Sequence, residues 1–413
     1  MRRAALALVC VAAVATACTS APDPIVVGAI YPITGSQGPG GLHEFRGVQL
    51  AADMVNAQGG VGGRAIRLEP VDVPAAAAAA PAVQALHRQG VRYVVGSYGS
   101  TISWPASAQA DRDGMLYWET GAVGMMPPQG QGTLVFRVPP TGAVLGGSAI
   151  DFVAQELAPR LHRNPTRLRF AVVNVGDAYG TEVARGAIDA IHRLGLPYAG
   201  DVTYDPNHVD PARVVRRIRA LRPDVLFVSA YVQDGVAVRR EMVAQHLHLV
   251  AAIGSSSSYC MVEFGRELGT DAVGLFASDK PDAWSLNPKG LSAPAAALLR
   301  DANERYEDRY HTYMDAPALA GFSAAWALFH DVMPSASALT PASVGAAALR
   351  TRLPQGSLPN GSGLAFAAAG TPDAGANVRA LGVIWEWQAP GRRVVVWPPI
   401  FARAPVRVLP LAT

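Results

Sequence analysis

The stretch YVVGSYGSTISWPASAQA, residues 93–110, decides how the rest of the chain is interpreted. An apolar run over residues 93–95 stops at Gly96, small hydroxyl residues follow, and an alanine-rich segment begins at Pro105. This order predicts a buried strand, a turn and a helix. Because ligands of parallel α/β sheets bind beyond the carboxyl ends of strands, the turn is a candidate ligand site.

The turn offers groups that suit an anion. Ser100 and Thr101 carry hydroxyl donors, and the first amides of a helix have no partner within it. The helix dipole favours a negative charge at the same place. Gly96 and Gly99 let the backbone approach a ligand closely. These features favour a carboxylate ligand, while the alternative is a purely structural turn and helix cap of the same composition.

Strands and helices alternate on both sides of this stretch. Apolar runs predict strands, and segments with apolar residues at helical spacing lie between them, as in EFRGVQLAADMVNAQGG at 44–60. The alternation restarts near residue 148 and predicts a second unit of similar size, with its first strand over 168–175. We therefore predict an α/β fold of two units with parallel sheets, several crossings and a cleft between the units.

Some expected elements have definite limits. The helix after the opening stretch is expected over 106–114. Two further helices are expected over 293–310 and 317–333, before a Gly/Pro-rich stretch at 353–363 and two final strands.

Composition and charge exclude several classes of function. Half of the 413 residues are hydrophobic, the formal net charge is only +3, and the basic residues are scattered. Such a distribution gives no footprint of nucleic-acid binding. The strings at 96–100 and 254–256 do not fit the G-x-S-x-G pattern of a hydrolase, and no P-loop or zinc signature is present. We predict no enzyme activity, no cofactor and no metal site.

The first residues predict export. Two arginines and an uncharged run match a secretory signal over residues 1–17, and the run is too short to span a bilayer. Ala15-Thr16-Ala17-Cys18 resembles a bacterial lipobox, with alanine where leucine is usual, so Cys18 is the predicted lipidation site and residues 18–24 a tether. The alternative is ordinary cleavage, which would release a soluble exported protein. Once Cys18 carries lipid, only Cys260 remains, so no internal disulfide is possible.

Several phrases of the sequence follow one known order. IVVGAIYPITG at 25–35, AADMVNAQGGVGGR at 51–64, YVVGSYGST at 93–101 and GDAYGTEVARG at 176–186 together resemble the type I periplasmic binding proteins of ABC importers. The leucine/isoleucine/valine-binding branch is the most similar group, and the resemblance covers roughly residues 25–399. It implies two Rossmann-like lobes, three crossover segments and hinge closure over a small solute.

The resemblance also divides the chain between the lobes. We expect an N-terminal lobe of residues 25–138 and 282–366. The C-terminal lobe would comprise residues 139–281 and 367–413.

The resemblance further implies ligand-binding residues in the first lobe. Ser100 matches the serine whose hydroxyl, with neighbouring amides such as that of Thr101, holds the ligand carboxylate. Gly121 and Ala122 would supply backbone groups to the ligand carboxylate and amine. Val123 stands where the amino-acid binders carry a threonine, so one hydroxyl contact is missing.

The second lobe both matches the family and departs from it. Tyr179 and Tyr231 match aromatic positions that face the cleft. Ser256 stands where the amino-acid binders carry the glutamate that pairs with the ligand ammonium, and Gly40 replaces an aromatic residue of the first lobe. An enclosed ammonium without a counter-charge costs on the order of several kcal/mol. Either the ligand lacks an α-amine or another acid replaces the glutamate, and the candidate acids are Glu119, Asp234 and Asp279.

The resemblance predicts an extracytoplasmic solute-binding lipoprotein. It would deliver a small solute to an ABC permease and be held at the membrane by its lipid anchor. Amino acids, short-chain amides, urea and aromatic or keto acids are all open as ligands. The alternative function is a ligand sensor of the same fold that acts with a separate signalling partner.

Overall fold

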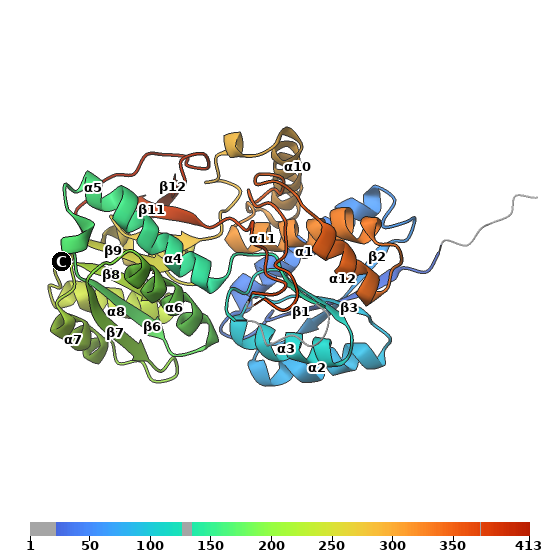
Figure 1. Cartoon of the computed structure of the whole chain (residues 1–413), viewed down its shortest axis with the longest axis horizontal. Helices are drawn as coiled ribbons and strands as arrows, with labels where there is room; N and C mark the ends of the chain where they lie inside the picture. The colour runs from blue at the N-terminus through green and yellow to red at the C-terminus, as the bar shows by residue number, and fades with distance from the viewer. Residues whose placement is uncertain (1–21, 126–133, 372) are drawn as a thin grey trace, which may run out of the picture.

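The computed structural model of the chain describes residues 22–125, 134–371 and 373–413. It contains two α/β lobes, each built around its own sheet (Figure 1), and this confirms the predicted fold class. The expected signal peptide and the lipidation site Cys18 lie outside the described residues. Among the helices of the described ranges, none is long and apolar enough to cross a membrane.

The first lobe begins with an alternating series of strands and helices. Its elements are β1 (Ile25–Tyr31), α1 (Gly38–Ala57), β2 (Ile66–Asp72), α2 (Ala76–Arg88), β3 (Tyr93–Val95), α3 (Ser100–Arg112), β4 (Leu116–Glu119) and β5 (Val135–Arg137). The strands form a five-stranded parallel sheet in the order β2-β1-β3-β4-β5. Strands β3, β4 and β5 are buried along their whole length, as is typical of a parallel sheet covered on both faces.

The second lobe repeats the alternation. Its elements are α4 (Gly142–Phe152), α5 (Ala158–Arg160), β6 (Phe170–Val175), α6 (Ala178–Arg193), β7 (Tyr198–Tyr204), α7 (Pro211–Leu221), β8 (Val225–Ser229), α8 (Val232–Ala244), β9 (Ala251–Ser255), α9 (Val262–Leu268), β10 (Phe276–Asp279), β11 (Val383–Ala389) and β12 (Arg392–Trp397). The seven-stranded sheet has the order β12-β11-β10-β9-β8-β6-β7. Among the described strands, β11 pairs in antiparallel fashion with β10 and with β12, and the other neighbours in this sheet are parallel.

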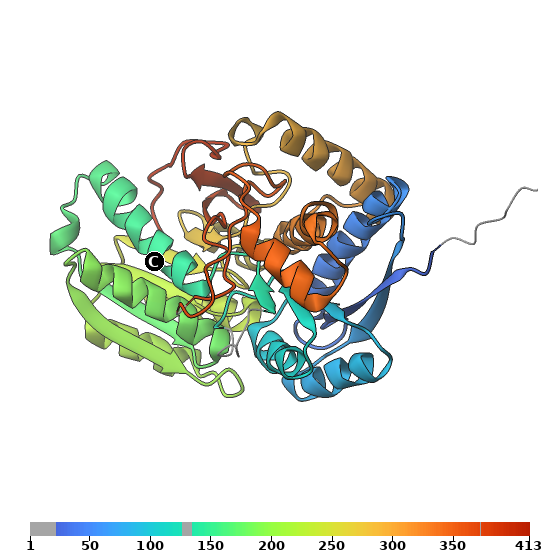
Figure 2. The same cartoon turned by 45° about the vertical axis from the view of Figure 1, so that its right-hand side comes forward.

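After β10 the chain returns to the first lobe and adds three helices. These are α10 (Ala293–Tyr310), α11 (Ala316–Trp326) and α12 (Pro341–Arg350), and they lie on the side of α1 (Figures 1 and 2). Trp118 on β4 donates its indole N–H to the carbonyl of Ala324 on α11 at 2.8 Å. The sequence analysis gave no helix for α12, although Thr340 caps it by accepting from the amide of Ser343.

The segment between α12 and β11 stays on the first lobe. Arg137 on β5 donates its amide to Gly375 O at 2.8 Å and accepts from the amide of Asn377 at 2.9 Å. Further along, the amide of Leu381 donates to Ser362 Oγ at 2.9 Å. The segment is therefore bonded to β5 as far as Asn377, and β11 in the second sheet begins six residues later, at Val383.

The helix of the opening stretch begins earlier than its sequence pattern indicates. The structure starts α3 at Ser100 instead of residue 106, because the carbonyl of Gly99 accepts from the amides of Ile102 and Ser103. The first turn of α3 is thereby brought to the end of β3. This start places the free amides of the helix at the edge of the sheet where ligands bind.

Candidate functional site

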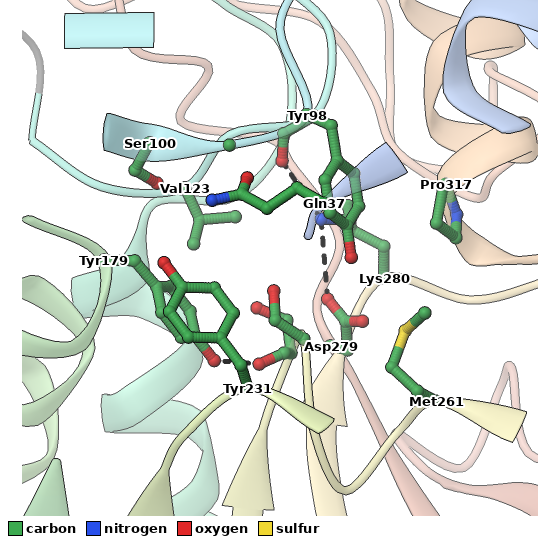
Figure 3. Close-up of a pocket in the computed structure, with 14 residues that line it drawn as sticks. Gln37, Tyr98, Ser100, Val123, Tyr179, Tyr231, Met261, Asp279, Lys280 and Pro317 are labelled. Atoms are coloured by element: carbon green, nitrogen blue, oxygen red, sulfur yellow. Dashed lines mark hydrogen bonds and ion pairs between the residues drawn. The ribbon is translucent and has the colours of Figure 1, made fainter. Parts of the chain in front are cut away.

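The carboxyl ends of several strands meet at a pocket between the two sheets (Figure 3). Residues that follow β3 and β4 line it from the first lobe, and residues that follow β6, β8 and β9 line it from the second. The predicted residues that line it are Ser100, Gly121, Val123, Tyr179, Tyr231 and Ser256. This position agrees with the general placement of ligands in parallel α/β sheets.

The pocket is small and continues into a larger groove. Its volume is about 10 Å³, close to the space that one water molecule needs. The groove beside it has a volume of about 990 Å³ and is lined by Thr101, which does not line the inner pocket. The two spaces adjoin each other, because five residues line both: Gln37, Tyr98, Tyr231, Ser257 and Met261.

Ser100 is oriented by a contact with the loop that follows β4. Gly124 donates its amide to Ser100 Oγ at 2.9 Å, so the oxygen is the acceptor in that bond and its hydrogen is available to a ligand. The amides of Ser100 and Thr101 begin α3 and have no partner within the helix. Val123 is 3% exposed and adds an apolar wall beside them. This corner suits a carboxylate.

The amides of Gly121 and Ala122 are directed away from the pocket. Both donate to Glu119 Oε1 at 2.9 Å, and the amide of Ala122 also donates to Ser97 O at 2.9 Å. These two amides are therefore engaged within the protein; Gly121 lines the pocket and Ala122 does not, and the prediction that both supply backbone groups to a ligand stays a prediction. The carbonyl of Gly121 accepts a hydrogen bond from Lys280 Nζ at 3.0 Å.

Two tyrosines form the wall of the second lobe. The rings of Tyr179 and Tyr231 lie with their centroids 5.4 Å apart. The phenol of Tyr179 lies 2.9 Å from Ser255 Oγ and donates to the carbonyl of Ser256, while Tyr231 donates to Asp177 Oδ2 at 2.6 Å. Burial raises the pKa of both phenols above its ordinary value, so both stay neutral hydroxyls at neutral pH.

An aromatic side chain that the sequence analysis did not select occupies the space above Gly40. A Cβ on Gly40 would lie 2.4 Å from Cζ of Tyr98. The glycine is thus required by the ring of Tyr98, which lines the pocket from the turn between β3 and α3. Its position within the turn that follows β3 could have marked Tyr98 as a candidate site residue.

The end of β10 contributes a buried ion pair that the sequence analysis recognised only in part. Asp279 and Lys280 are 3% and 5% exposed, and Lys280 Nζ lies 3.6 Å from Asp279 Oδ1. The thiol of Cys260 donates to Asp279 Oδ2 at 2.8 Å. Asp279 Oδ1 has no hydrogen-bond partner among the described residues. Asp279 was a candidate acid, whereas Lys280 was not selected.

The other two candidate acids lie outside the inner pocket. Glu119 is fully buried behind it and accepts from the surrounding backbone amides and from Ser103. Asp234 borders the outer groove and accepts a hydrogen bond from the phenol of Tyr204. Of the three candidates, Asp279 alone lines the pocket.

Two buried carboxyl groups lie behind the loop that follows β4. Glu44 Oε1 accepts from Thr120 Oγ1 at 2.6 Å, and its Oε2 has no hydrogen-bond partner within the described part of the chain. Burial, together with the neighbouring charge of Glu119, raises the pKa of Glu44 to about 8. Burial also raises the pKa of Glu119 to about 7, against the opposing effect of its many donors. Glu44 is therefore mostly protonated at neutral pH.

The site is built for non-covalent contacts with a small polar molecule. It offers free helix amides, hydroxyl groups, three phenols and one ammonium–carboxylate pair around a space between two sheets. In the ranges that the structure describes, no group of three or more His, Cys, Asp or Glu side chains is arranged to hold a metal ion.

Known proteins are similar to this chain in fold and, over most of its length, in sequence. A family model described as periplasmic binding protein matches residues 24–380. The Leu/Ile/Val-binding protein homolog 8 of Brucella suis is 28% identical over 401 residues, which cover 96% of each chain.

Two solved structures have the same fold. One is the branched-chain amino acid transporter substrate binding protein LivJ from Streptococcus pneumoniae in complex with isoleucine, with a TM-score of 0.69 and 19% identity over 91% of this chain and 100% of that one. The other is a solute binding protein of an ABC transporter from R. palustris in complex with benzoate, with a TM-score of 0.69 and 17% identity over 94% and 99% of the two chains. Since the family model matches most of its length, the chain belongs to the type I periplasmic binding proteins of the leucine/isoleucine/valine-binding family, which bind solutes and are not enzymes.

Proposed function

We propose that the protein is the solute-binding lipoprotein of an ABC importer on the extracytoplasmic face of a bacterial membrane. It holds a small amino-acid-like, amide or carboxylate solute between its lobes. The observation that carries the proposal is a pocket lined from both sheets, with Ser100 in the first lobe, Tyr179 and Tyr231 in the second and Lys280 at a crossing. A solute that contacts both lobes binds the closed form better than the open one, and it thereby shifts the population toward closure.

The division into lobes supports this mode of closure. The N-terminal lobe comprises residues 25–138 and 282–381, and the C-terminal lobe comprises residues 139–281 and 382–413. This division places the last crossing later than residue 366, because the amides of Asn377 and Leu381 still bond to first-lobe partners. The crossings are then short segments that act as hinges.

The ligand class is narrowed by what the relatives bind. Isoleucine and benzoate, the ligands named for the two solved structures, have a carboxylate in common. Ser100 and the first amides of α3 offer the donors that a carboxylate needs. A small carboxylate solute is therefore the first class to test.

The test begins with the protein purified without added solute. Native mass spectrometry identifies a co-purified molecule, and thermal shift followed by calorimetry is applied to branched-chain amino acids, oxo acids, benzoate, short amides and urea. The proposal predicts saturable one-to-one binding by at least one of them. The absence of both a co-purified mass and any shift would contradict it.

Transport is tested separately from binding. A strain that lacks the gene should lose uptake of the radiolabelled solute, and the gene supplied in trans should restore it. Normal uptake combined with a lost transcriptional response to the solute would favour the sensor alternative.

The lipid anchor rests on the sequence around Cys18. A clickable fatty acid should label the wild-type chain and Cys260→Ser, but not Cys18→Ser. Equal labelling of Cys18→Ser and the wild type would argue against the anchor.

A further inference from the structure

Lysine is rare in this chain, and one of its lysines is buried in the pocket. The sequence contains two lysines, Lys280 and Lys289, among 35 basic residues, so arginine provides nearly every positive charge. Lys289 is exposed, whereas Lys280 is 5% exposed and lines the pocket. The ammonium of lysine is a compact charge with three donors, unlike the planar guanidinium of arginine. In size and charge it resembles the α-ammonium of an amino acid.

The contacts of Lys280 are those of a bound ammonium. Its Nζ donates to the carbonyl of Gly121 at 3.0 Å and lies 3.6 Å from Asp279 Oδ1 (Figure 3). One carbonyl and one carboxylate are the partners that a ligand ammonium would need in a buried site. The Gly121 backbone is also where the sequence analysis expected the ligand amine. The protein's own side chain therefore takes the carbonyl of Gly121 and lies beside the carboxylate of Asp279.

The register of the sheet places the carboxylate of Asp279 beside the position that the amino-acid binders fill with a glutamate. Strands β9 and β10 are parallel, and Ser278 is level with Ser255. The next residues, Ser256 and Asp279, therefore lie at neighbouring strand ends. Ser256 stands at the position of the missing glutamate, so the acid is one strand away and is followed directly by Lys280.

We propose that the Nζ of Lys280 takes the place of the ligand α-ammonium, and that the protein selects small carboxylates without an α-amine, such as 2-oxo, 2-hydroxy or aromatic acids. The inference rests on the proposed function and specifies its solute. A ligand ammonium would have to enter beside Lys280, with Asp279 as the only acid among the lining residues that the structure describes. A carboxylate, by contrast, meets the ammonium of Lys280, the hydroxyl of Ser100 and the start of α3.

The charges behind the pocket do not restore a site for an amine. Glu119 is surrounded by amide donors, and Glu44 is mostly protonated at neutral pH because burial raises its pKa to about 8. Neither residue lines the pocket. The ion pair of Asp279 and Lys280 is therefore the charged group that a solute meets.

The experiment compares three ligands that share one carbon skeleton. These are 4-methyl-2-oxopentanoate, 2-hydroxy-4-methylpentanoate and L-leucine, which differ only at the second carbon. Isothermal titration calorimetry near neutral pH gives their dissociation constants. We expect the wild type to bind the oxo acid or the hydroxy acid about tenfold or more tightly than leucine.

Substitution of the lysine tests its part in this choice. Lys280→Met removes the charge but keeps an apolar stem, and Lys280→Ala makes room for a ligand ammonium. Both substitutions should weaken binding of the oxo acid. The ratio of the dissociation constant for leucine to that for the oxo acid should fall by about tenfold or more. Lys289→Met changes the exposed lysine and should keep the wild-type ratio. Thermal unfolding without ligand shows whether each variant is folded.

The outcomes separate this inference from the proposed function. A wild type that binds leucine more tightly than both acids overturns the inference while supporting a solute-binding protein, and this result needs no variant. A ratio that stays unchanged in folded Lys280→Met also overturns it. If none of the carboxylates, amides or amino acids binds, the proposed function fails and the inference fails with it.

Discussion

Replacement of Glu44 by glutamine is expected to remove a pH dependence from the stability of the protein. Glu44 is fully buried on α1, and burial raises the pKa of its carboxyl from 4.5 to about 8, with the charge of Glu119 as a second cause. Because the pKa of this carboxyl is higher in the folded than in the unfolded protein, the native state binds more protons than the unfolded state at pH values between the two. The free energy of unfolding therefore falls as pH rises through this window, and the stability is fully present only below it.

The size of the effect follows from the width of the window. One such carboxyl lowers the free energy of unfolding by about 1.4 kcal/mol for each pH unit between its two pKa values. From about pH 5 to about pH 8 the loss is roughly 3 to 4 kcal/mol, or roughly 4 to 5 °C in melting temperature for a chain of this size. The glutamine amide cannot ionise, and its oxygen can still accept from Thr120.

The assay is thermal unfolding followed by circular dichroism across this pH range. Wild type, Glu44→Gln and the control Glu304→Gln, which changes an exposed residue of α10, are compared without ligand. Glu119 also has a raised pKa, about 7, and lowers the stability of the wild type and of both variants as pH rises. The difference curve therefore reports the ionisation of Glu44 together with its coupling to Glu119. The control should follow the wild type. Parallel curves for Glu44→Gln and the wild type would refute the assignment of a raised pKa to Glu44.

Three further substitutions test the geometry of the site. Ser100→Ala removes the hydroxyl that Gly124 orients and should weaken binding of the identified carboxylate by about 1–3 kcal/mol; an unchanged dissociation constant would remove Ser100 from the site. Gly121→Ala places a Cβ 1.7 Å from Glu44 Oε2. It should lower the free energy of unfolding by about 1–3 kcal/mol or more, measured with urea. The control Gly147→Ala, whose Cβ meets nothing closer than 3.7 Å, should not lower it. Gly40→Ala forces the ring of Tyr98 to move and should reduce stability in the wild type but much less in Tyr98→Ala, with a coupling of about 0.5–3 kcal/mol in a double-mutant cycle.

The strand ends of the site could be predicted from local sequence pattern. Apolar runs indicate β3, β6, β8 and β9, and in a parallel sheet their carboxyl ends share one edge. Ser100, Tyr179, Tyr231 and Ser256 each follow such a run, and all four line the pocket. The strand ends need no long-range information, whereas the choice of Tyr179, Tyr231 and Ser256 among the residues that follow them came from the family resemblance.

Side-chain contacts between distant segments could not be predicted in the same way. Glu119 ends a strand and looks like a site residue, yet the amides of the following loop turn back onto it. Tyr98 fills the space above Gly40, a contact between two turns that no local pattern reports. Lys280 meets Gly121 across the two lobes. By contrast, α12 has a local start signal in Thr340 and Pro341, which the sequence analysis did not use.

The bond from Lys280 to Gly121 has two separable consequences for binding. It joins the crossing after β10 to the loop after β4 at 3.0 Å, and it uses no ligand atom. A contact of this kind favours the closed arrangement, so it raises the apparent affinity for every solute that fits the closed form. The positive charge, in contrast, discriminates between solutes, because it attracts a carboxylate and repels an ammonium. Loss of the bond alone should multiply the dissociation constants of all solutes by one factor. Loss of the charge should change the ratio of the dissociation constants for leucine and for the oxo acid. This ratio therefore measures the role of Lys280 in ligand choice.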